Sequence, residues 1–245
     1  MLTLKYEFLA DEGEKDYYPH PIPAAKAIPA WYKNMPRSRH FITNEVKPTT
    51  TWVEEGVSRL ANGATIKECI PVRDYLTSGY IIPMWFELAL YKNEGNLEWG
   101  YTDEGPHNAR ISPHYPSQYM DTPLWNGKDN TKHIPKLKSP WGFKTPKGYS
   151  SFFFSPRYSD SLIEILPAIV DTDMHHEVNF PFVYKGEEGV QNKIELGTPV
   201  IQVIPFKRQD WASSVSEKEY RKRGKFRAYL SQAYLKLHHS KKRYR

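Results

Sequence analysis

Four apolar segments decide the fold: YSSFFFSPRY (149–158), SLIEILPAIV (161–170), VNFPFVYK (178–185) and TPVIQVIPFKR (198–208). They are rich in β-branched and aromatic residues, which favour strands, and turn-forming residues such as those of Leu196–Pro199 separate them. Short strands that recur in this way are typical of antiparallel sandwiches and jelly rolls. We therefore predict a mainly β body, an antiparallel β-sandwich of jelly-roll type.

The rest of the body extends this pattern. Further strands are expected at 2–9, 64–73, 80–91 and 97–101. In the Pro-rich arm 19–50, a short N-terminal helix fits residues 30–33, with Pro29 as its first residue and Pro36 as its stop. Residues 102–147 contain seven prolines and are predicted to form a long loop.

Aromatic residues make up 14% of the 245 residues, which argues for a packed core although only 39% of the chain is hydrophobic. A single cysteine, Cys69, excludes a disulfide framework and a Cys-rich zinc site. Because Cys69 lies in an apolar stretch, we expect it to be buried.

Positive charge is concentrated at the C-terminal end. The chain has a net charge of +6, yet residues 218–245 hold 11 Lys or Arg and one acid, a net charge of +10, so that residues 1–217 carry −4. A capping box at Ser216 and Glu219, followed by helically spaced apolar residues, predicts a basic amphipathic helix. We therefore divide the chain into a β body (1–213) and a basic helical tail (214–245).

The tail offers three kinds of partner. Its helix could dock on the acidic body of this chain, on an acidic surface of another subunit or of another protein in an assembly, or on nucleic acid. The residues predicted to provide this electrostatic docking are Arg221, Lys222, Arg223, Lys225, Arg227, Lys241, Lys242 and Arg243. No stretch approaches 18 apolar residues, so no membrane partner is expected.

Sequence motifs of several enzyme classes are absent. The chain has no G-x-G-x-x-G, Walker A, H-E-x-x-H or G-x-S-x-G motif. This argues against a dinucleotide enzyme, a P-loop NTPase, a zincin and an α/β-hydrolase. Without a complete catalytic motif, the leading hypothesis is a non-enzymatic protein that docks through its basic helix.

The densest cluster of chemically active side chains lies between two predicted strands, where ligands often bind. It contains Asp171, Asp173, His175, His176 and Glu177. The H-x-E spacing of His175 and Glu177 could begin a non-haem iron site, but no further His occurs before His238 in the tail. A calcium loop would need Gly at 176 and Glu at 182, and His and Phe stand there. No cofactor is expected. The alternative to a non-enzymatic protein is a metal-dependent enzyme that binds a divalent metal at this turn.

A second candidate site is the corner that joins two predicted strands. Arg73, Asp74, Thr77, Tyr80 and Trp85 would line a pocket there for a small ligand. A simpler interpretation is that Asp74 and Thr77 satisfy turn amides.

Three segments resemble an uncharacterised family of tailed phages, particularly marine and cyanobacterial ones. They are IPAWYKNMP (28–36), CIPVRDYLTSGYII (69–82) and GTPVIQVIPF (197–206). The resemblance spans most of residues 20–211 and implies a phage origin, with the protein in the cytoplasm of an infected host cell or in the virion. The non-enzymatic protein would then be a virion component or an interaction module, and the partner of its basic helix could be a virion protein. It implies no catalytic residues, because the function of the family is unassigned.

Overall fold

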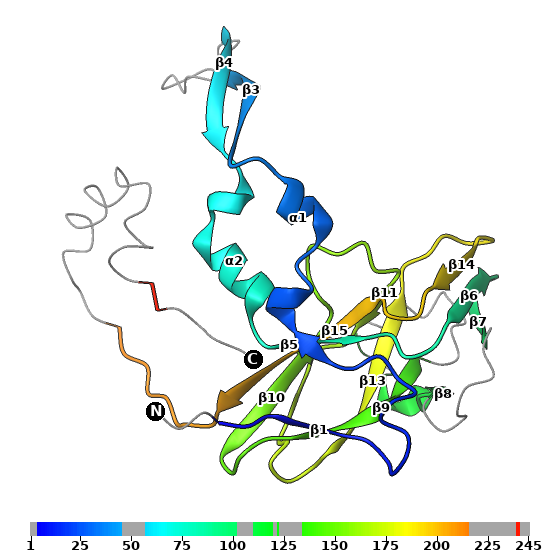
Figure 1. Cartoon of the computed structure of the whole chain (residues 1–245). Helices are drawn as coiled ribbons and strands as arrows, with labels where there is room; N and C mark the ends of the chain where they lie inside the picture. Colours follow the sequence, from blue (N-terminus) through cyan, green and yellow to red (C-terminus); the bar gives the residue numbers. More distant parts are fainter. Residues whose placement is uncertain are drawn as a thin grey trace. The chain divides into compact units, whose positions relative to one another are not determined.

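The computed structural model describes residues 4–45, 57–101, 110–119, 122, 134–215 and 239–240. Two units are present (Figure 1). The first, called the body below, comprises the described residues within 1–27 and 79–213. The second includes the described residues of 28–78 together with 239–240.

The body is built from antiparallel strands in three sheets. One sheet has the order β1-β9-β13-β11, with β8 also paired to β9; another has the order β12-β10-β15-β5-β2; the third is β14-β6-β7. The bounds are β1 Glu7–Leu9, β2 Ile22–Pro23, β5 Tyr80–Pro83, β6 Leu88–Asn93, β7 Asn96–Tyr101, β8 Ile111–Pro113, β9 Pro135–Lys144, β10 Tyr149–Phe154, β11 Ile163–Ile165, β12 Ala168–Val170, β13 Glu177–Tyr184, β14 Gln191–Ile194 and β15 Pro199–Lys207. Short 3₁₀ turns lie at Ala24–Lys26 (η1) and Pro116–Gln118 (η3). The prediction of a mainly β, antiparallel fold is confirmed.

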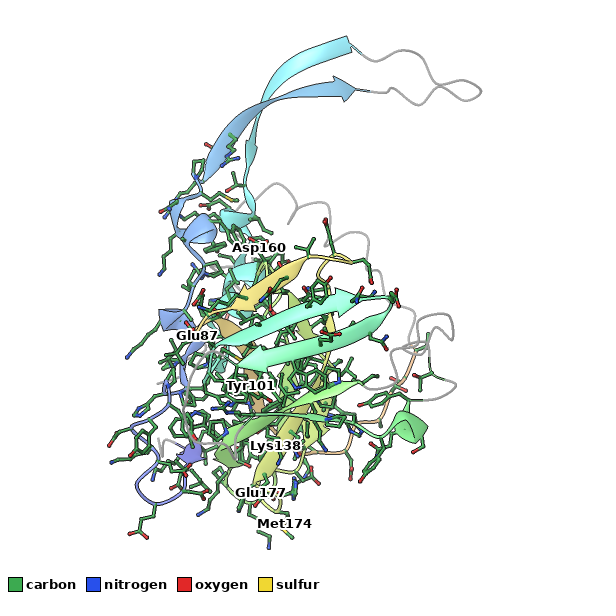
Figure 2. The ribbon with its side chains drawn as sticks, turned by 90° about the vertical axis from the view of Figure 1, so that its right-hand side faces the viewer. Glu87, Tyr101, Lys138, Asp160, Met174 and Glu177 are labelled. Carbon is green, nitrogen blue, oxygen red and sulfur yellow. The ribbon has the colours of Figure 1, made fainter. Side chains whose placement is uncertain are left out.

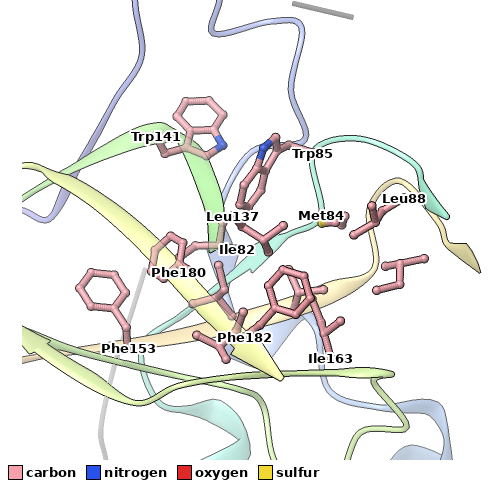
Figure 3. Close-up of a cluster of buried hydrophobic side chains, with 14 of the residues drawn as sticks. Ile82, Met84, Trp85, Leu88, Leu137, Trp141, Phe153, Ile163, Phe180 and Phe182 are labelled. Atoms are coloured by element: carbon pink, nitrogen blue, oxygen red, sulfur yellow. The ribbon is translucent and has the colours of Figure 1, made fainter. Parts of the chain in front are cut away.

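An aromatic core joins the two larger sheets of the body (Figure 3). Phe143 of β9 lies 5.0 Å from Phe153 of β10, and Phe180 of β13 lies 5.4 Å from the same ring, measured between ring centroids. All three are almost completely buried, as is Phe182. Large aromatic rings bury about 150–250 Å² each, so a few of them supply much of the core.

The smaller unit contains the short helix that the sequence predicts. Helix α1 spans Ala30–Asn34, with Pro29 at its N-cap, one position before the expected place. The unit also contains the hairpin β3 (Ser38–Glu45) and β4 (Val57–Ala64), the 3₁₀ turn η2 (Ile66–Glu68) and helix α2 (Ile70–Thr77). The hairpin was not predicted, because residues 19–50 were expected to form an arm.

Three local predictions are wrong. Residues 64–73 form η2 and the start of α2 rather than a strand, because the Thr65 side chain caps η2 and Pro71 fits the first turn of α2, where a missing N–H costs nothing. The run 80–91 is divided between β5 and β6, which belong to different sheets. Cys69 is exposed at the N-cap of α2.

Part of the predicted loop 102–147 is regular structure. Strand β9 spans ten of its residues, and β8 pairs with it. Pro135 is the first residue of β9, and Pro140 lies at an irregularity in its pairing with β13, the two places where a strand tolerates a residue without an N–H.

The predicted tail helix and all eight of its docking residues lie outside the described residues, so the division into a body (1–213) and a tail stays a prediction. Within the described part of the chain, no helix is long and apolar enough to cross a membrane.

Candidate functional site

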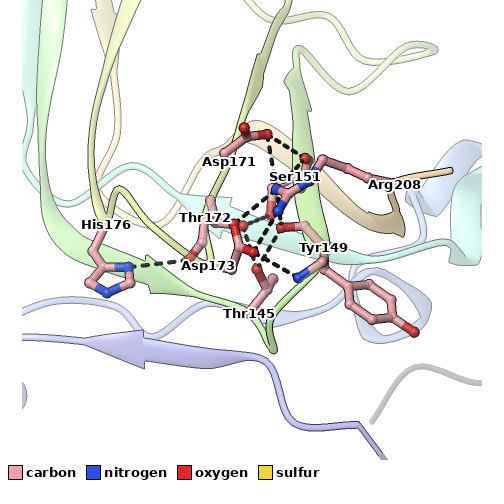
Figure 4. A network of polar contacts seen from close by, with 10 residues as sticks. Thr145, Tyr149, Ser151, Asp171, Thr172, Asp173, His176 and Arg208 are labelled. Atoms are coloured by element: carbon pink, nitrogen blue, oxygen red, sulfur yellow. Dashed lines mark hydrogen bonds and ion pairs between the residues drawn. The ribbon is translucent and has the colours of Figure 1, made fainter. Parts of the chain in front are cut away.

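The predicted cluster at 171–177 is divided by the structure into two parts with different surroundings. The first part, Asp171 and Asp173, faces Arg208 at the end of β15 (Figure 4). The Arg208 guanidinium donates to both carboxylate oxygens of Asp173, at 2.8 and 2.6 Å. The Gly148 N–H donates to the same carboxylate at 2.7 Å. Arg208 and this amide hold the pKa of Asp173 at about 2.

Buried hydroxyl groups continue this network inward. Thr172 Oγ1 lies 2.9 Å from Thr145 Oγ1 and 2.8 Å from Ser151 Oγ, and Ser151 in turn bonds the Tyr6 hydroxyl at 2.9 Å. Thr172 and Ser151 are completely buried. Because the hydroxyls and the Asp173 carboxylate are used within the protein, this part of the turn is structural. No group of three or more His, Cys, Asp or Glu side chains in the described residues could hold a metal ion, so the geometry gives the metal interpretation no support.

The second part, His176 and Glu177, lies on a groove of the body. Three segments line it: residues 9–11 and 14 after β1, residues 138–142 of β9, and residues 176–179 at the start of β13. The groove has a volume of about 450 Å³. Figure 2 shows Lys138 and Glu177 near one another, at the end of the body that carries Met174.

An irregularity in β9 lies where this strand lines the groove. Glu177 pairs with Gly142 and Asn179 with Lys138, so three residues of β9 stand opposite one residue of β13. Ser139 Oγ accepts from the Trp141 N–H at 3.0 Å and donates to the Trp141 carbonyl at 2.9 Å, which replaces the lost ladder bonds. Such bulges re-aim side chains and are frequent next to functional sites.

Gly142 lets the three segments approach one another closely. A Cβ atom at this position would lie 3.2 Å from Leu9 Cβ and 3.5 Å from the His176 carbonyl oxygen. A side chain at this position would therefore require Leu9 to shift by a few tenths of an ångström.

The orientation of the His176 ring is fixed by the backbone. Its Nδ1 lies 3.1 Å from the Thr172 carbonyl oxygen and 3.2 Å from the Phe143 carbonyl oxygen. Carbonyl oxygens only accept, so Nδ1 carries the proton and Nε2 of the neutral ring carries the lone pair. Figure 4 shows the other ring nitrogen pointing away from the polar network. In contrast, His175 is exposed and does not line the groove.

The second predicted site is spread over both units. Arg73, Asp74 and Thr77 lie on α2, where the Thr77 hydroxyl donates to the carbonyl oxygens of residues 73 and 74. The Asp74 carboxylate forms a hydrogen bond with His239, whose Nε2 lies 2.9 Å from Oδ1. Tyr80 and Trp85 belong to the body, where Tyr80 packs on Phe8 and Trp85 is 2% exposed. Ligand binding by this set stays a prediction.

The comparison with known proteins does not assign the chain to a family. No family model and no curated protein matches the chain. Among solved structures, a mutant dUTPase of Staphylococcus bacteriophage 80alpha with dUpNHpp is similar with a TM-score of 0.32 and 12% identity, over 58% of this chain and 76% of that chain. A mutant dUTPase from phage phi11 of S. aureus gives a TM-score of 0.32 and 11% identity, over 58% of this chain and 83% of that chain.

The prediction of a non-enzymatic virion component or interaction module is wrong. It depended only on missing motifs, and no comparison supports a non-enzymatic role. At these TM-scores and identities, the likenesses carry no argument about which activity this chain has.

Proposed function

We propose that the protein binds a small polar molecule in the groove between β9 and β13, and that His176 Nε2 accepts a hydrogen bond or a proton from it. The observation that carries this proposal is the fixed tautomer of His176. Two backbone carbonyls hold the Nδ1 proton, so the lone pair of Nε2 belongs to a ring that lines the groove. A general base needs a defined tautomer and a defined orientation of this kind.

The other polar groups of the groove would orient the bound molecule. Lys138 and Asn179, which face each other across the bulge, supply donors, and Glu177 and Glu14 supply carboxylate acceptors. Pockets that bind small molecules typically combine an apolar wall with a few polar groups of this kind. Here residues 9, 10, 140 and 178 supply the apolar part.

The experiment is a screen of small polar compounds against the ¹⁵N-labelled full-length chain, with chemical shifts as the readout. We expect binding compounds to move the ring resonances of His176, and His176→Asn to weaken their binding at least fivefold. His175→Asn is the matched control, because it changes the exposed neighbour and should leave affinity unchanged. Equal loss in both variants, or compounds that bind only outside residues 9–14, 138–142 and 176–179, would refute the proposal.

Where the protein is located is a separate proposal. The segments at 28–36, 69–82 and 197–206 support a phage origin, with the protein in the infected cell or in the particle. Mass spectrometry of infected cells and of purified particles tests it, and detection in neither would count against it.

A further inference from the structure

The two units of the chain differ in the sign of their charge. Residues 28–78 of the smaller unit hold seven Lys or Arg and five acids, a net charge of +2, and the tail 218–245 carries a further +10. Residues 1–27 and 79–213, which belong to the body, hold 16 Lys or Arg and 21 acids, a net charge of −5. Charge that is segregated in this way favours a polyanionic partner for the basic part of the chain.

The end of the tail belongs to the smaller unit. His239 Nε2 lies 2.9 Å from Oδ1 and 3.0 Å from Oδ2 of Asp74 on α2. The side chains of His239 and Asp74 are only 8% and 14% exposed, so this contact is shielded from solvent. The positive charge of the tail is therefore tethered to the unit that already carries a positive charge of its own.

Exposed basic side chains gather at the base of the hairpin β3–β4. Lys33 lies in the last turn of α1, and Arg37 and Arg39 lie where the chain enters β3. All three are exposed, and within the described residues only Arg37 has an ion-pair partner, Glu68 at 3.5 Å. Exposed Lys and Arg side chains of this kind are the usual contacts of phosphate oxygens in nucleic acid.

Hydrogen bonds from the far side of the hairpin hold the backbone of this basic segment in place. Thr65 Oγ1 donates to the Pro36 carbonyl oxygen at 2.6 Å. Lys67 Nζ donates to the carbonyl oxygens of Lys33 at 2.7 Å and of Met35 at 3.0 Å, and so adds a fourth positive charge at the same place. Because this segment is ordered in the free protein, less ordering has to take place when a partner binds.

The hairpin has the shape of an element that enters the major groove of DNA. Strands β3 and β4 pair over eight residues each, and neither pairs with another strand of the described chain, so they form a two-stranded ribbon (Figure 1). The major groove of B-form DNA admits such a ribbon, whereas the major groove of A-form RNA is too narrow and deep. Among polyanions, the ribbon therefore favours double-stranded DNA.

We propose that the smaller unit binds double-stranded DNA. The hairpin β3–β4 lies in the major groove, and Lys33, Arg37 and Arg39 at its base contact the phosphates on the rim of this groove. The positive charge of the tail strengthens the same association. This inference concerns a different unit from the groove that contains His176, so it does not depend on the proposed function.

The salt dependence of the affinity tests the phosphate contacts. Fluorescence anisotropy of a labelled DNA duplex, titrated with the full-length chain, measures the affinity at about 50 and 200 mM salt. Three phosphate contacts give a slope of log K against log salt of about −2.7, so the affinity should fall by about 40-fold or more over this range. An RNA duplex of the same sequence and a polyglutamate of equal charge should both bind at least fivefold more weakly than the DNA.

Variants locate the surface. The triple variant Lys33→Gln/Arg37→Gln/Arg39→Gln should weaken DNA binding at low salt at least tenfold and reduce the slope by about 2–3. Arg37→Lys/Arg39→Lys keeps the charge and should retain most of the affinity, which separates lost phosphate contacts from a damaged fold.

A matched control removes three charges from the body and should change the slope by less than about one. It replaces exposed lysines that form no ion pair within the described part of the chain: Lys147→Gln, Lys185→Gln and Lys207→Gln. Equal slopes in the two triple variants, RNA or polyglutamate binding as tight as DNA binding, or no DNA binding at about 50 mM salt would overturn the proposal.

Discussion

Replacing Thr172 with Val tests whether the buried hydroxyl network holds the turn that carries His176. Valine has nearly the same shape, so no cavity is created, but the Thr172 Oγ1 contacts to Thr145 (2.9 Å) and Ser151 (2.8 Å) are lost. A buried neutral hydrogen bond contributes about 0.5–1.5 kcal/mol to stability. The two partner hydroxyls are not left without a hydrogen bond, because Thr145 keeps its bond to the Tyr149 carbonyl and Ser151 keeps its bond to Tyr6. We therefore expect the free energy of unfolding to fall by about 2 kcal/mol.

Thermal unfolding followed by tryptophan fluorescence measures this effect. For a chain of this size, about 2 kcal/mol corresponds to a fall in Tm of roughly 4–8 °C. Thr198→Val is the matched control, because its hydroxyl makes a single exposed bond to the Glu195 carbonyl, and its cost should stay below about 0.5 kcal/mol. A Thr172→Val protein as stable as the Thr198→Val protein would refute the structural role of the network.

Two further predictions concern the framework of the body. The pKa of Asp173 is lowered from its ordinary value to about 2, so its pairing with Arg208 stabilises the fold fully above about pH 4, and this contribution is lost as the pH falls towards 2. Asp173→Asn should therefore lower the free energy of unfolding at neutral pH and flatten its dependence on pH between about 4 and 2, as measured by urea unfolding. Asp171→Asn is the control and should have a smaller effect, because the Asp171 side chain is 59% exposed. Gly79 has φ +70°, and a Cβ atom there would overlap the Val203 carbonyl oxygen, so Gly79→Ala should cost more than about 3 kcal/mol or abolish folding. Gly189→Ala is the control, because Gly189 has φ +75° but nothing lies within 4 Å of the added atom, and it should cost only about 1–2 kcal/mol of stability. Similar losses of stability in both variants would contradict the role assigned to Val203.

The strands that form the core were predictable because their pattern is local. The segments at 149–158, 178–185 and 198–208 contain β10, β15 and nearly all of β13, since β-branched and aromatic residues favour strands. Strand β13 buries alternate side chains, whereas β15 buries the consecutive residues 200–203. Strand β9 was missed because its prolines resemble those of a loop. Pro140 is tolerated there only because Ser139 supplies the bonds that a regular ladder would have made.

Part of the candidate site was predictable because its residues are neighbours in the sequence. His176 and Glu177 belong to the cluster selected from the sequence, but spacing drew attention to His175 as the metal ligand. The carbonyl oxygens of Thr172 and Phe143 fix the ring of His176 alone, and residue 143 lies on β9, far away in the sequence. The acidic loop at 11–16 joins the groove through β1, whose pairing with β9 is a long-range contact that no local pattern reveals.

The central claim is that His176 presents Nε2 to a ligand in the groove. Long-range ¹H–¹⁵N correlation spectra of the neutral imidazole ring test it most directly. We predict the tautomer with the proton on Nδ1 and a shift of the Nε2 resonance when a compound that binds in the groove is added. A ring that carries its proton on Nε2, or an Nε2 resonance that no groove ligand moves, would contradict the claim.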